Sequence, residues 1–198
     1  MLGLVAALTL TFSPYGPSFS NDHSIAPPID PQVFVKDATA QAGSGPQSIT
    51  HDQGYRPALL ASDPPTAPLF SANGAPLGVT LGKWISATGT LDITPLNRDA
   101  ETVAVHLDGL SPYGTYSVFV IGRDAQPGEL TPLDGTGSGN SVVADEGGSA
   151  TSTMLVSPVL AGGSAIVVIF HSDGAPHGMS PGAPGVTSHT QLIARLPK

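Results

Sequence analysis

The sequence contains no cysteine. This absence excludes disulfide bonds, thiolate zinc sites, iron–sulfur clusters and a cysteine nucleophile. Charged residues are also scarce, at 11% of the 198 residues, and seven lysines and arginines stand against fifteen aspartates and glutamates. Because the formal net charge is −8, we do not expect the protein to bind nucleic acid or anionic lipid through a basic patch.

The N-terminal apolar segment is too short to cross a membrane. Leu2–Phe12 has about eleven residues, whereas a membrane span needs about twenty. Its length is typical of the apolar region of a signal peptide, with cleavage before Asn21, although no lysine or arginine precedes it. The alternative is a β-strand over Leu2–Thr11, where threonines alternate with leucines. Residues 1–20 are therefore interpreted as a signal peptide or an N-terminal strand, and a signal peptide would direct the protein to the exterior or the cell envelope.

Turn-forming residues are abundant, with 24 glycines and 20 prolines, which disfavours long helices. Proline removes a backbone donor and fixes φ, so a proline-rich stretch favours extended chain. Residues 21–68 hold eight prolines and are predicted to form an extended arm or linker that includes one edge strand; the prolines are Pro27, Pro28, Pro31, Pro46, Pro57, Pro64, Pro65 and Pro68.

Residues 69–198 are predicted to form one all-β domain, because runs of β-forming residues alternate there with glycine, proline, asparagine and aspartate clusters. Seven strands are expected, at Val79–Ile85, Thr88–Thr94, Thr102–Asp108, Thr115–Gly122, Thr151–Val156, Ser164–His171 and Thr187–Leu196. The second and third strands are expected to form a hairpin. The number of strands favours an antiparallel Greek-key β-sandwich of about seven to eight strands.

Two of the expected strands are apolar at every position, namely Val118–Ile121 and Ile166–Phe170. A strand that is apolar on both faces is expected to be covered on both sides. Since an ordinary sandwich leaves one face of each sheet in water, either the proline-rich arm or a partner is expected to cover these strands.

The run Leu107–Val118, which reads LDGLSPYGTYSV, resembles a corner of fibronectin type III and related immunoglobulin-like domains. The resemblance is carried by Gly109, Leu110, Pro112, Tyr116 and Val118, and it covers about a dozen residues of the chain. It implies that Tyr116 is buried and that its hydroxyl bonds to backbone between Gly109 and Pro112. It also implies a sandwich used for binding or spacing, without catalysis.

A histidine cluster near the C-terminus is the strongest candidate site. His171 ends one expected strand, His189 begins the next, and the loop between them carries Asp173 and His177. An antiparallel hairpin would bring its two ends together, so the three imidazoles and the Asp173 carboxylate are predicted to hold zinc or copper. The alternative interpretation is that these residues only form hydrogen bonds within a turn.

Other candidate sites carry weaker signals. The glycine-rich acidic loop from Asp134 to Glu146 has oxygen donors that suit calcium, but it lacks the regular spacing of an EF-hand and is interpreted as a flexible loop. His106 lies on the polar face of its strand and is expected to face solvent. No Gly-x-Ser-x-Gly motif occurs, so nothing supports a serine hydrolase.

The sequence therefore favours an exported, non-catalytic interaction or structural module. Its expected partners are a protein, a surface glycan or further copies of itself. The alternative function is a copper or zinc protein, with redox activity as one form of it.

Overall fold

The computed structural model describes residues 7–26, 28–45, 47–126 and 128–198. These residues form antiparallel sheets and two short helices, as the sequence predicts for an all-β protein. The strands are β1 (Leu8–Thr11), β2 (Ser13–Pro14), β3 (Phe34–Lys36), β4 (Gly43–Ser44), β5 (Thr50–His51), β6 (Tyr55–Pro57), β7 (Pro68–Phe70), β8 (Pro76–Thr80), β9 (Thr88–Pro95), β10 (Glu101–Asp108), β11 (Thr115–Ile121), β12 (Thr131–Pro132), β13 (Ser141–Val143), β14 (Ala150–Val156), β15 (Ala165–His171) and β16 (Ser188–Arg195), and the helices are α1 (Pro17–Asp22) and α2 (Leu81–Ile85).

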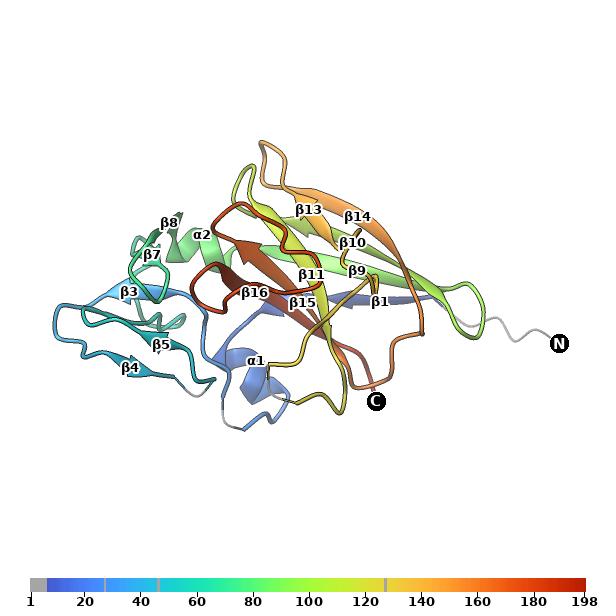
Figure 1. Cartoon of the computed structure of the whole chain (residues 1–198), viewed down its shortest axis with the longest axis horizontal. Helices are drawn as coiled ribbons and strands as arrows, with labels where there is room; N and C mark the ends of the chain where they lie inside the picture. Colours follow the sequence, from blue (N-terminus) through green and yellow to red (C-terminus); the bar gives the residue numbers. More distant parts are fainter. Residues whose placement is uncertain (1–6, 27, 46, 127) are drawn as a thin grey trace.

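Two larger sheets share one apolar core and give the protein a sandwich-like body (Figure 1). One sheet has the order β1-β9-β10-β14, and the other has the order β12-β11-β15-β16-β2, with β13 also paired to β11. Leu91 and Val105 of the first sheet and Val118 and Ile166 of the second are among the fully buried residues of this core. The core therefore uses one face of each strand, as period-two patterns predict.

Six of the seven strands expected in residues 69–198 are present, and the expected hairpin of β9 and β10 is confirmed. The strand expected at Val79–Ile85 is wrong, because β8 ends at Thr80 and the single-turn helix α2 follows. The Thr80 hydroxyl accepts a hydrogen bond from the Lys83 N–H at 3.4 Å, which caps that turn. Leu81 and Trp84, three residues apart, are both buried by it.

Part of the N-terminal segment belongs to the larger sheets. β1 pairs with β9, and β2 pairs with β16. Phe12, Tyr15 and Phe19 are buried, with exposed fractions of 4%, 8% and 3%. Of the expected strand at Leu2–Thr11, residues 8–11 form β1, while residues 1–6 lie outside the described residues.

The described parts of residues 21–68 do not form a single extended arm, which corrects that expectation. β3 and β6 join β7 and β8 in a third sheet, and β4 pairs with β5. Pro57 ends β6 and Pro68 begins β7, positions where a missing N–H disrupts little of a ladder. Short strands thus tolerate these two prolines. Pro27 and Pro46 lie outside the described residues.

Ion pairs of Arg56 also hold this region together. The Arg56 guanidinium pairs with Asp37 at 3.1 Å and with Asp63 at 2.7 Å.

The outer face of the second sheet is covered, by Tyr15 and Phe19, which precede the predicted proline-rich arm, and by Ile29 within it. Tyr15, Phe19 and Ile29 form a second apolar cluster with Phe119 and Val167, which point away from the shared core. The N-terminal segment therefore buries the outer face of β11 and β15. Among the described residues, no helix is long and apolar enough to span a membrane.

Tyr116 is fully buried at the start of β11, and its hydroxyl accepts a hydrogen bond from the Ser111 N–H at 2.9 Å. This contact falls within the stretch Gly109–Pro112 that the sequence indicates, so the expected burial and hydrogen bond of Tyr116 are confirmed. The Tyr116 ring also packs against Phe170 with 5.3 Å between ring centroids. Burial raises the pKa of the phenol above its ordinary value, so the hydroxyl stays neutral.

We expect the Tyr116→Phe variant to lower the free energy of unfolding by about 1 kcal/mol, because it leaves the Ser111 N–H without its partner. Urea denaturation followed by fluorescence or circular dichroism measures this loss. Tyr113→Phe is the matched control, since the Tyr113 side chain is exposed and should show no change. Equal stability of the Tyr116→Phe variant and the wild type would contradict the role of the hydroxyl.

A chain that begins at Asn21 should be less stable by several kcal/mol than one that begins at Ala7. The shorter chain loses β1, β2 and three buried aromatic side chains, and burying one large apolar side chain contributes about 1.5–3 kcal/mol. Comparative urea denaturation of the two chains measures the difference. Identical midpoints would mean that residues 7–20 add nothing to the fold.

Candidate metal centre

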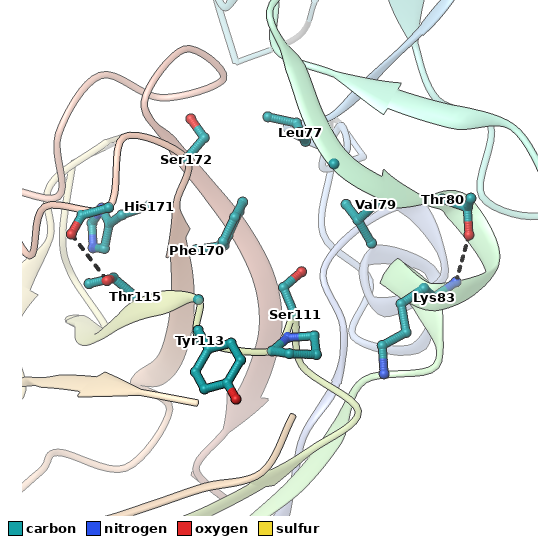
Figure 2. A pocket seen from close by; sticks show the side chains of 14 residues that line it. Leu77, Val79, Thr80, Lys83, Ser111, Tyr113, Thr115, Phe170, His171 and Ser172 are labelled. Carbon is teal, nitrogen blue, oxygen red and sulfur yellow. Dashed lines mark hydrogen bonds between the residues drawn. The ribbon is translucent and has the colours of Figure 1, made fainter. Parts of the chain in front are cut away.

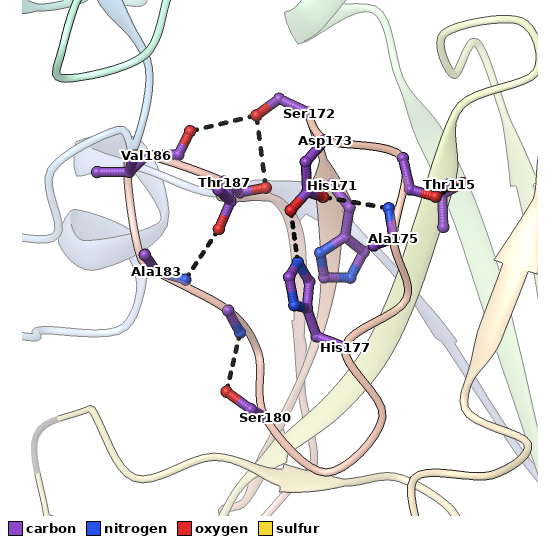
Figure 3. A network of polar contacts seen from close by, with 12 residues as sticks. Thr115, His171, Ser172, Asp173, Ala175, His177, Ser180, Ala183, Val186 and Thr187 are labelled. Atoms are coloured by element: carbon purple, nitrogen blue, oxygen red, sulfur yellow. Dashed lines mark hydrogen bonds and ion pairs between the residues drawn. The ribbon is translucent and has the colours of Figure 1, made fainter.

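The candidate site lies in the hairpin formed by β15 and β16. The two strands are antiparallel, as expected, and His171 at the end of β15 pairs with Ser188 at the start of β16. Residues 172–187 form the loop between them, which folds back over the end of β15 (Figure 3). A rigid strand end and a loop thus supply the candidate ligands together.

His171 is anchored by the sheet. Its ring is buried, and its Nε2 lies 2.8 Å from the Ser117 hydroxyl on the neighbouring strand β11. Its Nδ1 is buried and has no hydrogen-bond partner among the described residues. Burial, followed by the nearby His177, lowers the pKa of His171 to about 4, so the ring is neutral near pH 7. A neutral imidazole is the form that binds metal ions.

His177 and Asp173 lie beside this ring on the loop. The His177 Nε2 is 2.9 Å from the Asp173 carboxylate, and the centroids of the two histidine rings are 5.1 Å apart. His177 and Gly178 both have positive φ, of 31° and 62°, which turns the chain back toward the strand end. Burial raises the pKa of Asp173, but the Ala175 N–H and His177 outweigh it, so the net pKa is lowered and the carboxylate is ionised.

His171, Asp173 and His177 each offer one ligand atom, and these atoms all lie within 4.8 Å of one another. Ligand atoms in a tetrahedral zinc site lie roughly 3.5 Å apart, so an ion would draw the three side chains closer together. The two loop residues can make this movement, because their side chains are 27% and 33% exposed. Two imidazoles and a carboxylate suit zinc or copper(II) and leave a coordination position open.

His189 does not join this cluster, which corrects the expected ligand set. His189 pairs with Phe170, one residue before His171, and successive side chains of a strand point to opposite faces. The His189 Nδ1 donates to the Gln32 carbonyl at 2.7 Å, and its Nε2 lies 3.1 Å from the Ser172 hydroxyl. Both nitrogens are therefore occupied, and His189 ties the loop and β16 to the segment around Gln32.

Ser117 is the site residue that sequence reasoning missed. It is a polar residue in a strand whose next four residues are apolar, and it is fully buried. A lone hydroxyl on the buried face of a central strand requires a hydrogen-bond partner. A serine in an apolar strand was therefore the sequence signal that could have identified Ser117. Its partner is the His171 ring, so Ser117 fixes the orientation of that ring.

A cavity of about 560 Å³ borders the site on the side of β8 and α2 (Figure 2). His171, Ser172 and Gly174 line one wall of this cavity, and Val79 and Lys83 line another. The Thr115 hydroxyl donates to the Gly174 carbonyl at 3.1 Å, which holds the loop against β11. A small molecule in this cavity would lie beside the first residue of the cluster.

The acidic glycine-rich loop has a structural explanation. The Asp134 carboxylate accepts hydrogen bonds from the N–H groups of Thr136, Gly137, Ser138 and Gly139 at 2.7–3.1 Å. Burial raises the pKa of Asp134, but the Thr136 hydroxyl and the N–H groups of Gly139, Gly137 and Thr136 outweigh it and lower the pKa to about 2. The loop thus uses its own carboxylate to order its backbone.

His106 faces solvent as expected, 3.7 Å from Asp92.

No known protein family matches the chain, and no significant match occurs among curated proteins. The chemistry of the site therefore rests on the geometry of these residues.

Stability should fall as the pH falls below about 6.5, in part because of His189. Burial lowers the pKa of His189 below its ordinary value of 6.5, so below that pH the unfolded chain binds a proton that the folded chain does not. The free energy of unfolding then declines by at most about 1.4 kcal/mol per pH unit for this residue. The His189→Asn variant keeps a donor for the Gln32 carbonyl but cannot be protonated, so its decline should be smaller.

Urea denaturation between about pH 7.5 and pH 5 measures this slope. The exposed His106→Gln variant serves as the control and should keep the wild-type slope. A wild-type slope in the His189→Asn variant would contradict the assignment.

Proposed function

We propose that this protein is an exported β-sandwich module that binds zinc or copper(II) through His171, Asp173 and His177. The tyrosine corner and the two packed sheets support an immunoglobulin-like Greek-key arrangement for that module. Export to the exterior or the cell envelope is proposed without cleavage before Asn21, because β1, β2 and the buried Phe12, Tyr15 and Phe19 belong to the folded protein.

The observation that carries the proposal is the buried, unpartnered Nδ1 of His171. A buried polar atom without a partner costs about 1–3 kcal/mol, so a retained one calls for an explanation. A metal ion would satisfy this nitrogen, and the adjacent His177 and Asp173 supply two more ligands of the types that zinc and copper prefer. The alternative, a turn that only forms hydrogen bonds, accounts for His177 and Asp173 but leaves this nitrogen unsatisfied.

The surrounding residues prepare the site for a metal ion. The Ser117 hydroxyl holds the His171 Nε2, so the ring is already oriented with its Nδ1 as the remaining ligand atom. The Asp173 carboxylate is ionised and therefore attracts a cation to the site. One rigid ligand and two loop ligands allow the loop to close around an ion at little cost to the sheet.

A second candidate function is an interaction or structural module that needs no metal. β14 is an edge strand of the first sheet, and its Leu155 side chain is 60% exposed beside an unpaired strand edge. Such an edge is a template for β-pairing with a protein partner or with another copy of the chain. The metal measurement below separates the two candidates, because this second function predicts no stoichiometric ion.

Untagged protein should bind one Zn²⁺ or Cu²⁺ per chain in isothermal titration calorimetry. We expect the His177→Gln variant to lower the affinity at least tenfold, because it removes a ligand on an exposed loop without disturbing the core. Affinity should also fall as the medium is acidified, since protons compete for the imidazoles.

His106→Gln is the matched control for that titration. His106 forms a second histidine–aspartate pair, with Asp92, but it lies outside the three-residue group. This variant should bind as the wild type does. Wild-type protein that binds no ion, or a His177→Gln variant with unchanged affinity, would contradict the proposed site.

A further inference from the structure

A second cavity, of about 670 Å³, lies on the outer face of the β11-β15-β16 sheet, away from the candidate metal centre. Its floor includes Val167 of β15 and Ile193 of β16. Its walls include Phe19 of α1 and Ile25 on one side and Leu130, which precedes β12, on the other. Figure 1 shows α1 and the chain after β11 on this side of the sheet. The lining is thus largely apolar and comes from elements far apart in the sequence.

Positive charge gathers at one end of this cavity. The Arg195 Nε donates to the Gly163 carbonyl at 3.4 Å, and the aliphatic parts of Arg123 and Lys198 lie against Gly163. Three of the seven lysines and arginines of a chain with net charge −8 therefore meet at one glycine. Arg123, Arg195 and Gly163 all line the cavity, together with one acidic residue, Glu129.

The acidic groups nearby do not neutralise Arg195 directly. Asp124 forms an ion pair with Arg123 at 3.2 Å, and the Glu129 carboxylate accepts the Gln126 N–H at 3.0 Å. No carboxylate forms an ion pair with Arg195 within the part of the chain that the structure describes. Arg195 is partly exposed and lines the cavity, so its guanidinium is available to a ligand there.

We infer that this cavity binds a single-chain anionic amphiphile, namely a long-chain carboxylate. The volume lies within the range of about 300–1,000 Å³ that is usual for small-molecule sites, and the apolar lining suits an alkyl chain. A guanidinium matches a carboxylate in geometry and charge, so Arg195 would hold the head group while the chain lies along the partly exposed Ile25, Ile121 and Leu130. Sequence reasoning did not find this site because its cations stand at positions 123, 195 and 198, with no basic run.

The test uses displacement of a fluorescent fatty acid from the full chain, with palmitate and hexadecanol as competitors. The two competitors share a chain length and differ in the charged head group. Wild-type protein should bind palmitate at least tenfold more tightly than hexadecanol. The Arg195→Gln variant should lose most of that preference, because it removes the charge while keeping a polar side chain of similar length.

Two further variants complete the test. Arg98→Gln, in the exposed turn between β9 and β10, is the matched charge control and should behave as the wild type does. Leu130→Glu places a charge on the apolar wall and should weaken both competitors. Wild-type protein that binds neither competitor, or an Arg195→Gln variant with an unchanged preference, would overturn the inference.

A parallel arm separates a free ligand from a membrane surface. Protein is sedimented with vesicles of anionic phospholipid, and we expect it to remain in the supernatant. Sedimentation with the vesicles together with no binding of free palmitate would assign the cations to a lipid surface and overturn the inference. The metal-site variant His177→Gln should bind palmitate normally, so failure of the metal proposal does not affect this result.

Discussion

The fold depends on the burial of the β11-β15-β16 sheet on both of its faces. β15 is buried at all seven positions, and Val167 and Val168 point to opposite sides of it. The first sheet covers one face, so the other must be covered by chain from elsewhere. The N-terminal segment does this with Tyr15, Phe19 and Ile29. Packing on both faces explains why that segment folds against the sandwich despite its prolines.

The same alternation decides the composition of the candidate metal centre. The Phe170 side chain packs in the shared core. The next residue, His171, points to the outer face of the sheet, where its Nε2 contacts the Ser117 hydroxyl. His189 is opposite Phe170 and therefore shares the inner side. His171, at the end of β15, therefore lies beside the loop residues, whereas His189, near the start of β16, bonds to the Gln32 carbonyl. The apolar cavity lies on the same outer face, and the covering residues Tyr15, Phe19 and Ile29 form part of its lining.

Much of the larger sheets could be predicted from the sequence, because alternation in β9 and β10 and uniform apolarity in β15 report which faces are buried. The Tyr116 corner was also predictable from a local motif, since its hydrogen bond spans only five residues. The prediction of a strand at Val79–Ile85 was wrong because its apolar residues suit a helical turn as well as a strand. The Thr80 N-cap favours the helical turn. The folded course of residues 34–57 depends on long-range pairing that local composition does not report.

The candidate site was predictable only in part for a related reason. Sequence proximity indicated that His171, Asp173 and His177 share one hairpin. The register of β15 and β16, which places His189 opposite Phe170, cannot be inferred from the sequence alone. A crystal structure of the protein soaked with zinc tests the proposed metal site most directly, because anomalous scattering locates the ion. We expect an ion about 2.0–2.1 Å from the His171 Nδ1, with His177 and Asp173 as further ligands. An ordered loop with the His171 Nδ1 still unliganded at saturating zinc would contradict it.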